Sequence, residues 1–294
     1  MNEEKKMRLA QQDNESADEL ARRIEHQQRA ENLQRESELE NRVAPYRIGS
    51  VPYLNAAPLT RGIEEQILFA APSQLADLLE KDQLDAALVS VIEALSYDKF
   101  DILDGIAIAS LNEVKSVLLA HRRPLDEIDV VYYDSASLTS VTLLRILLLE
   151  QGLKPRFIPF DDYSSADKLD YVMLIGDQAL DFLYYKKTHS IWDLGAAWYD
   201  LTKLPFVYAV WAIRRGVENP ERLKRILREA RDFGMDTLDY IIGSRTEYDY
   251  DFRKDYLTWN IHYHLGADEK RGINRFMEFL EKHKICRVYP PRYV

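Results

Sequence analysis

Short apolar runs alternate with helical patterns along most of this chain, and no other feature of the sequence restricts its fold as strongly. The runs at 84–89 (LDAALV), 128–133 (IDVVYY) and 171–175 (YVMLI) have the length and composition of buried strands. Segment 138–151 is the longest helical pattern, and Gly152 ends it. Strands that alternate with helices are typical of mainly parallel sheets with helices on both faces. The sequence therefore predicts an α/β fold.

The same patterns predict further elements between and beyond these runs. The other expected strands lie at 47–51, 67–71, 114–120, 156–159 and 206–213. The other expected helices lie at 74–81 (with Ser73 as its cap), at 91–96, after Gly176, and over most of 220–285.

The two long apolar runs at 114–120 and 206–213 suggest places where the chain crosses between two lobes. On this interpretation lobe one comprises residues 46–115 plus 212–294, and lobe two comprises residues 116–211. A ligand would then bind in the cleft between the lobes, as in periplasmic binding proteins of type 2. A single doubly wound sheet is the alternative that the periodicity leaves open.

Residues 1–45 have a composition unlike the rest of the chain. The segment is rich in charged residues, Gln and Asn, and it has no Gly, Phe, Tyr or Trp. Pairs of opposite charge four residues apart, such as Asp18 and Arg22, support a solvated helix. We predict a charged helical or disordered extension, and a partner-binding helix is the alternative.

Composition and charge exclude several classes of protein. The 294 residues carry a net charge of −10, which excludes an extended nucleic-acid footprint. The single cysteine, Cys286, rules out an internal disulfide. No run approaches the roughly 18 apolar residues of a membrane span, and the first residues lack the apolar stretch of a signal peptide. We therefore expect a cytoplasmic protein, whose oligomeric state the sequence does not give.

Polar residues follow the first predicted strand, at the end where open α/β sheets bind ligands. This strand runs into Pro52-Tyr53-Leu54-Asn55, and an Asn side chain can both donate and accept hydrogen bonds. A turn in which the Asn side chain caps the strand is the alternative. Ser90 ends another apolar run, and Ser116 lies inside a third, where it either faces the cleft or bonds to backbone.

Two later segments place polar groups at the start of a helix. Segment 134–140 (DSASLTS) has four hydroxyl residues, where helix N–H groups and the helix dipole favour an anion. Capping by Ser137 alone is the alternative. Asp177, which follows Gly176, either puts a carboxylate at the edge of the sheet or caps the next helix.

The sequence lacks the motifs of several common enzyme classes, namely GxSxG, GxxxxGK[ST] and GxGxxG after a strand. His262 and His264 form an HxH pair on one face of a predicted strand. Because no Cys or carboxylate cluster adjoins the pair in the sequence, we predict no metal site there, with metal binding as the alternative.

Six of these segments, taken in order, resemble the MqnA family, the chorismate dehydratases of the futalosine route to menaquinone. The resemblance spans roughly residues 46–290. The segments are RIGSVPYLNAAPL (47–59), LDAALVSVIEAL (84–95), EVKSVLLA (113–120), DSASLTSVTLLRILL (134–148), LIGDQAL (174–180) and DLGAAWYDLTKLPFVYAVWA (193–212).

The resemblance implies the two-lobe binding-protein fold and an elimination of water from chorismate, the reaction of a carbon–oxygen lyase (hydro-lyase). Loss of the C3 proton and the C4 hydroxyl makes the ring aromatic and gives 3-[(1-carboxyvinyl)oxy]benzoate. Because aromatisation drives the reaction, the protein has mainly to orient the substrate and hold its two carboxylates. The resemblance implies no metal or organic cofactor.

The resemblance also implies roles for individual residues. Asn55 matches the Asn of the family's YLN motif, and Ser116 matches the Ser of its VxSVxL motif. Both are expected to be catalytic residues that contact the substrate. The residues expected to bind substrate beside them are Tyr53, Ser90, Ser137, Thr139, Ser140 and Asp177.

None of the motif residues is an obvious base. Asp177 and Glu93 are candidates by position only, and we favour the hypothesis that the substrate's own enolpyruvyl carboxylate removes the proton. The chain departs from the family at Pro52, where Ser is common, and at Asn112, where Gly is common. Asn tolerates the left-handed conformation better than most residues, so the turn is expected to persist.

Two other functions stay open at this point. One is the sister enzyme of the same pathway, which forms a dihydroxynaphthoate on the same fold and would be expected to use a His in its cleft; none of the motifs contains one. The other is a small-anion-binding protein without catalysis.

Overall fold

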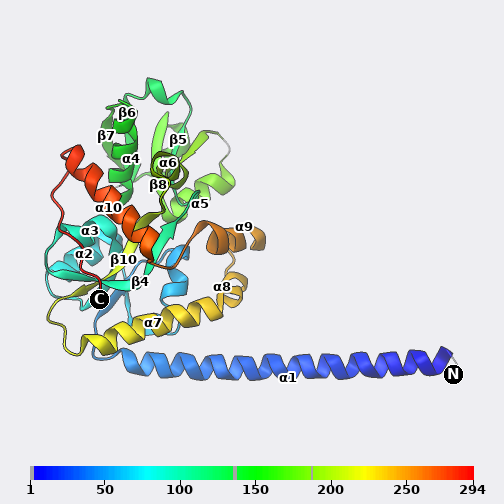
Figure 1. Cartoon of the computed structure of the whole chain (residues 1–294). Coiled ribbons are helices and arrows are strands. Elements are labelled where there is room, and N and C mark those ends of the chain that lie inside the picture. The colour runs from blue at the N-terminus through cyan, green and yellow to red at the C-terminus, as the bar shows by residue number, and fades with distance from the viewer. Residues whose placement is uncertain (1–2, 135–137, 187) are drawn as a thin grey trace.

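The computed structural model describes residues 3–134, 138–186 and 188–294, and its strands form two five-stranded sheets (Figure 1). The first sheet has the order β2-β1-β3-β10-β4, and the second has the order β7-β6-β8-β5-β9. The strands of the first sheet are β1 (Ile48–Ser50), β2 (Leu68–Phe69), β3 (Ala86–Ser90), β4 (Phe100–Ser110) and β10 (Phe206–Arg214). Those of the second are β5 (Val117–His121), β6 (Val130–Asp134), β7 (Arg156–Phe160), β8 (Tyr171–Ile175) and β9 (Ser190–Asp193).

Both sheets mix parallel and antiparallel pairs. In the first, β1 is parallel to β2 and β3, whereas β10 is antiparallel to β3 and β4. In the second, β6 is parallel to β7 and β8, whereas β5 is antiparallel to β8 and β9. Four of the five strands in each sheet therefore run in the same direction, as the prediction of mainly parallel sheets requires. The exceptions are β5, where the chain enters the second sheet, and β10, where it returns to the first, and each runs against both neighbours. The division into lobes at residues 115/116 and 211/212 stays a prediction. All of β10 belongs to the first sheet, although the second boundary falls within this strand.

Helices pack on both sheets, and the long helix α1 extends beyond them (Figure 1). They are α1 (Glu3–Val43), α2 (Pro72–Glu80), α3 (Val91–Ser96), α4 (Leu138–Glu150), α5 (Gly176–Tyr185), α6 (Leu194–Thr202), α7 (Pro220–Asp236), α8 (Leu238–Ser244), α9 (Tyr250–Asp255) and α10 (Ala267–Lys282). Within the described ranges, we find no helix with both the length and the apolar character needed to cross a bilayer.

The charged N-terminal segment forms the long helix α1, whose first part projects away from the rest of the molecule (Figure 1). Its last turns pack against α7, with Leu39 and Val43 buried in the core and Arg42 paired with Glu229. Leu20, nearer the N-terminus, is exposed. The C-terminal end of α1 therefore packs against α7 and stabilises it, which the sequence pattern does not predict.

Helix α7 in turn positions the short 3₁₀ helix η1 (Leu54–Leu59), which carries Asn55. The face of α7 turned inward is apolar and includes the buried Phe233. Gly234 lets the two helices approach closely, since a Cβ atom at this position would lie 1.9 Å from the carbonyl oxygen of Pro58. A larger residue would push η1 and Asn55 out of place.

The sequence patterns do not predict strands β4 and β9. The apolar run of β4 is interrupted by Asp104 and Gly105, and the register of β4 against β10 shifts between Ile102 and Ala107. A bulge of this kind hides the regular alternation by which a strand is recognised.

Two other local predictions are wrong. Helix α2 has Ala71 as its cap and Pro72 in its first turn, where proline fits, so Ser73 is not the cap. His262 makes a single bridge to Ala109 and is not part of a strand, because the chain turns from here into α10.

Candidate functional site

A cavity lies between the two sheets, and residues of both line it. Val51, Ser90 and Tyr208 contribute from the first sheet and its loops, and Val117 and Ile175 contribute from the second. The empty space is about 560 Å³, with the part of its mouth that is open to solvent included. We call this cavity the cleft.

Asn55 reaches the cleft from the start of η1. The buried strand β1 ends at Ser50, and the chain then turns through Pro52 into the short helix. The carboxamide oxygen Oδ1 of Asn55 is buried and has no hydrogen-bond partner within the described part of the chain, and η1 has no side-chain cap. The strand-capping turn is therefore not formed, and a buried acceptor is left facing a site where a ligand can satisfy it.

Tyr53 also lines the cleft, and its ring packs across it against Gly176 at the start of α5. Gly176 has a φ of 54°, a left-handed conformation that favours glycine. This contact ties the end of β1 to the second sheet.

Ser116 is buried and lines the cleft at the point where the chain enters the second sheet. Its hydroxyl lies 3.4 Å from the carbonyl oxygen of Val114, so the cleft-facing and backbone-bonded alternatives both hold. The backbone carbonyl of Ser116 accepts a hydrogen bond from Gly176 N at 2.8 Å. The left-handed residue of this turn is Lys115, with a φ of 61°, and not Asn112.

Asp193 holds this turn in place. Its carboxylate accepts hydrogen bonds from the backbone N–H groups of Val114 and Lys115, and from those of Gly195 and Ala196 at the start of α6. Burial raises the pKa of Asp193, and the N–H donors oppose that rise. Asp193 is not among the site residues predicted from the sequence, although an Asp followed by Leu-Gly-Ala-Ala is a helix-cap signal.

Two of the predicted hydroxyl residues line the cleft beside Asn55 and Ser116. They are Ser90, which donates to Glu93 Oε2 at 2.7 Å, and the buried Ser140 in the first turn of α4. Ser137, which precedes α4, lies outside the described residues. Thr139 does not line the cleft; its hydroxyl accepts a hydrogen bond from Ile92 N at 3.1 Å and so joins the starts of α3 and α4.

The two carboxylates considered as bases lie behind the cleft wall. Asp177 accepts a hydrogen bond from Leu54 N at 3.3 Å and does not cap α5, and Glu93 accepts the hydrogen bond from Ser90. Burial raises the pKa of each carboxyl. Neither side chain is among the lining residues of the cleft.

Tyr256 does not line the cleft itself but lies beside Asn55 and Ser116, and sequence reasoning misses it. It begins a π-helical turn (Tyr256–Asn260), it is fully buried, and its hydroxyl has no hydrogen-bond partner among the described residues. Burial raises the pKa of Tyr256, and the nearby side chains of Ser116 and Asn55 oppose that rise. One tyrosine among 18 gives no sequence signal of this cluster, because residues far apart in the chain form it.

Known structures share the two-sheet fold. A crystal structure of a protein from Archaeoglobus fulgidus is 17% identical, has a TM-score of 0.67, and the match covers 82% of this chain and 98% of that one. The periplasmic aliphatic sulphonate binding protein SsuA from Escherichia coli is 14% identical, with a TM-score of 0.54 over 85% of this chain and 93% of that one. The fold and the cleft thus define a two-lobe protein of the periplasmic-binding-protein type.

Sequence comparison narrows this class to a family. The profile of a family described as menaquinone biosynthesis matches residues 46–282. A chorismate dehydratase of Thermus thermophilus is 31% identical in an alignment 268 residues long that covers 84% of this chain and 99% of that one. The chain belongs to this menaquinone biosynthesis family.

Replacing Asp193 by Asn should destabilise the fold. Asn keeps one acceptor oxygen, but its NH₂ group would take the place of Oδ2. It would then face the backbone N–H groups of Val114 and Lys115, which now donate hydrogen bonds to Oδ2. We expect the free energy of unfolding, measured by urea denaturation, to fall by about 3 kcal/mol. Asp200→Asn on the exposed side of α6 is the matched control and should change it by less than about 0.5 kcal/mol. Equal effects of the two substitutions would contradict the role given to Asp193.

Proposed function

We propose that this protein eliminates water from chorismate to give 3-[(1-carboxyvinyl)oxy]benzoate, as a carbon–oxygen lyase. The observation that carries the proposal is the buried cluster of Asn55, Ser116 and Tyr256 at the cleft, in which Asn55 Oδ1 and the Tyr256 hydroxyl have no hydrogen-bond partner among the residues that the structure describes. Asn55 and Ser116 fall on the YLN and VxSVxL motifs. The curated relative from Thermus thermophilus carries the name of this activity.

The reaction needs orientation more than strong acids or bases. The C3–H bond breaks, its electron pair forms the new ring double bond, and the C4–O bond breaks as hydroxide leaves and takes up a proton to form water. Asn55 and Ser116 hold the ring and the leaving hydroxyl through neutral hydrogen bonds. Tyr256 lies beside Asn55 and Ser116 and acts as a positioning residue through this proximity.

The substrate's two carboxylates are held by the dipoles of hydroxyl groups and of backbone N–H groups, and not by charged side chains. The described residues that line the cleft include Ser90 and Ser140 and no Lys or Arg. Ser140 sits in the first turn of α4, where backbone N–H groups and the helix dipole favour an anion. A site of this kind binds a dianion without pairing it to a fixed cation.

The cytoplasmic location expected from the sequence stays a prediction.

The proton at C3 is removed by the enolpyruvyl carboxylate of the substrate itself. Asp177 and Glu93 are each committed to a hydrogen bond with the protein and do not line the cleft, which supports this assignment. The described lining also has no His, the residue expected of the dihydroxynaphthoate-forming sister enzyme.

The proposal is tested by incubating the purified protein with chorismate and separating the products by chromatography. We expect loss of chorismate and appearance of the aromatic enolpyruvyl ether in equal amounts. If chorismate stays unchanged but protects the fold against heat, the protein is a binder and not an enzyme. If chorismate neither reacts nor protects, the proposal fails and the sister enzyme's substrate is tested next.

Tyr256→Phe removes one hydroxyl and keeps the ring. If Tyr256 positions Asn55, kcat should fall by about tenfold to a hundredfold, or about 1.4–2.7 kcal/mol of barrier, with a smaller change in KM. Tyr293→Phe is the matched control, because its buried hydroxyl also lacks a partner but lies away from the cleft. The same kinetic loss in both variants would rule out a specific role for Tyr256.

Asp177→Asn and Glu93→Gln test the assignment of the base. With substrate-assisted deprotonation, each variant should keep kcat within about tenfold of the original. A general base contributes about 10²- to 10⁴-fold. A fall of that size in either variant, with an unchanged unfolding transition, would make that carboxylate the base and refute the assignment to the substrate.

A further inference from the structure

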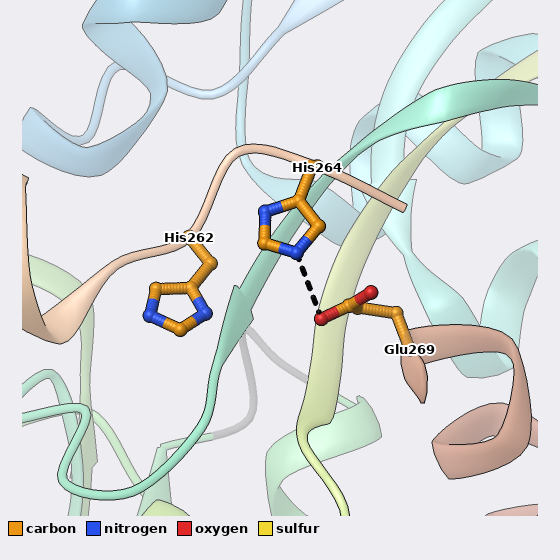
Figure 2. Close-up of side chains that lie close together, drawn as sticks. All are labelled: His262, His264 and Glu269. Atoms are coloured by element: carbon orange, nitrogen blue, oxygen red, sulfur yellow. Dashed lines mark ion pairs between the residues drawn. The ribbon is translucent and has the colours of Figure 1, made fainter. Parts of the chain in front are cut away.

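Three side chains outside the cleft come together on the first lobe: His262, His264 and Glu269 (Figure 2). Each offers one ligand atom, and these atoms all lie within 4.8 Å of one another. His264 Nε2 lies 3.1 Å from Glu269 Oε1, and the two imidazole rings stack with their centroids 5.5 Å apart. None of the three lines the cleft, so the cluster is not explained by the proposed reaction.

The backbone fixes the positions of these groups. His262 exchanges two hydrogen bonds with Ala109 of β4, at 2.7 and 3.0 Å. Between the two histidines, Tyr263 points into the core, which turns both imidazoles to the other side of the extended segment. Glu269 is held in the first turn of α10, where its Oε2 accepts a hydrogen bond from Gly266 N at 2.9 Å.

The burial of Glu269 favours a cation beside it. Its side chain is only 5% exposed, while its partner His264 is 59% exposed and open to solvent. A buried carboxylate is stabilised by a positive charge or a metal. Cations from solution can reach the cluster from the side of His264.

We propose that His262, His264 and Glu269 form a binding site for a divalent transition metal, best matched by Zn²⁺. Two imidazoles and one carboxylate are a known zinc ligand set with a fourth position for water. Zinc–ligand bonds of about 2.0–2.1 Å in a tetrahedron place ligand atoms about 3.3 Å apart, close to the His264–Glu269 spacing. His262 would supply the third ligand, since its ligand atom lies within 4.8 Å of the other two. The metal would then tie segment 261–266 to α10.

The test uses metal-free full-length protein titrated with Zn²⁺ in a calorimeter, and with Co²⁺ followed by visible absorption. We expect one equivalent of Zn²⁺ per chain and the intense absorption of four-coordinate Co²⁺. At a hundredfold excess of Zn²⁺ over its Kd, the melting temperature should rise by about 5 °C. Neither readout depends on turnover.

Variants locate the site. His264→Ala removes an exposed side chain, and Glu269→Gln keeps the shape and an acceptor for Gly266 N. Each should weaken Zn²⁺ binding at least tenfold. His26→Ala, on the exposed part of α1, is the matched control and should leave binding unchanged. No Zn²⁺ binding by the unaltered protein, or binding that all three variants retain equally, would overturn the proposal.

Discussion

The carboxylate of Asp193 is the interaction on which the rest of the site depends. It accepts hydrogen bonds from backbone N–H groups of two segments, the start of α6 and the turn before β5. That turn carries the chain from the first sheet to the second and presents Ser116 to the cleft. One buried charge thus fixes the crossing between the sheets and the position of a site residue, and the N–H donors compensate for its burial.

The cleft combines rigid support with polar groups that lack partners. The close contact of α7 with η1 holds Asn55, and the Tyr53–Gly176 contact holds the facing wall. A core rarely leaves a carboxamide oxygen and a phenol hydroxyl without hydrogen-bond partners, yet Asn55 Oδ1 and the Tyr256 hydroxyl have none in the ranges that the structure describes. Such atoms lower the stability of the ligand-free protein and regain their hydrogen bonds when a polar ligand binds.

Much of the candidate site could be predicted from the sequence. Asn55, Ser90 and Ser116 each follow or lie within an apolar run, and strand ends gather at one edge of a sheet. Asp177 and Thr139 come from the same kind of pattern but make hydrogen bonds within the protein instead. The pattern places a residue near the cleft; the direction in which its side chain points depends on neighbours that the pattern does not specify.

The sequence by itself determined the α/β class, most of the buried strands, the distinct charged segment before residue 46 and the family. Apolar periodicity and short motifs encode these locally. Only the tertiary structure decided the antiparallel placement of β5 and β10, the cluster of Tyr256 with Asn55 and Ser116, and the meeting of His262, His264 and Glu269. Each of these brings together groups through packing between elements, and local sequence patterns carry no information on which elements meet.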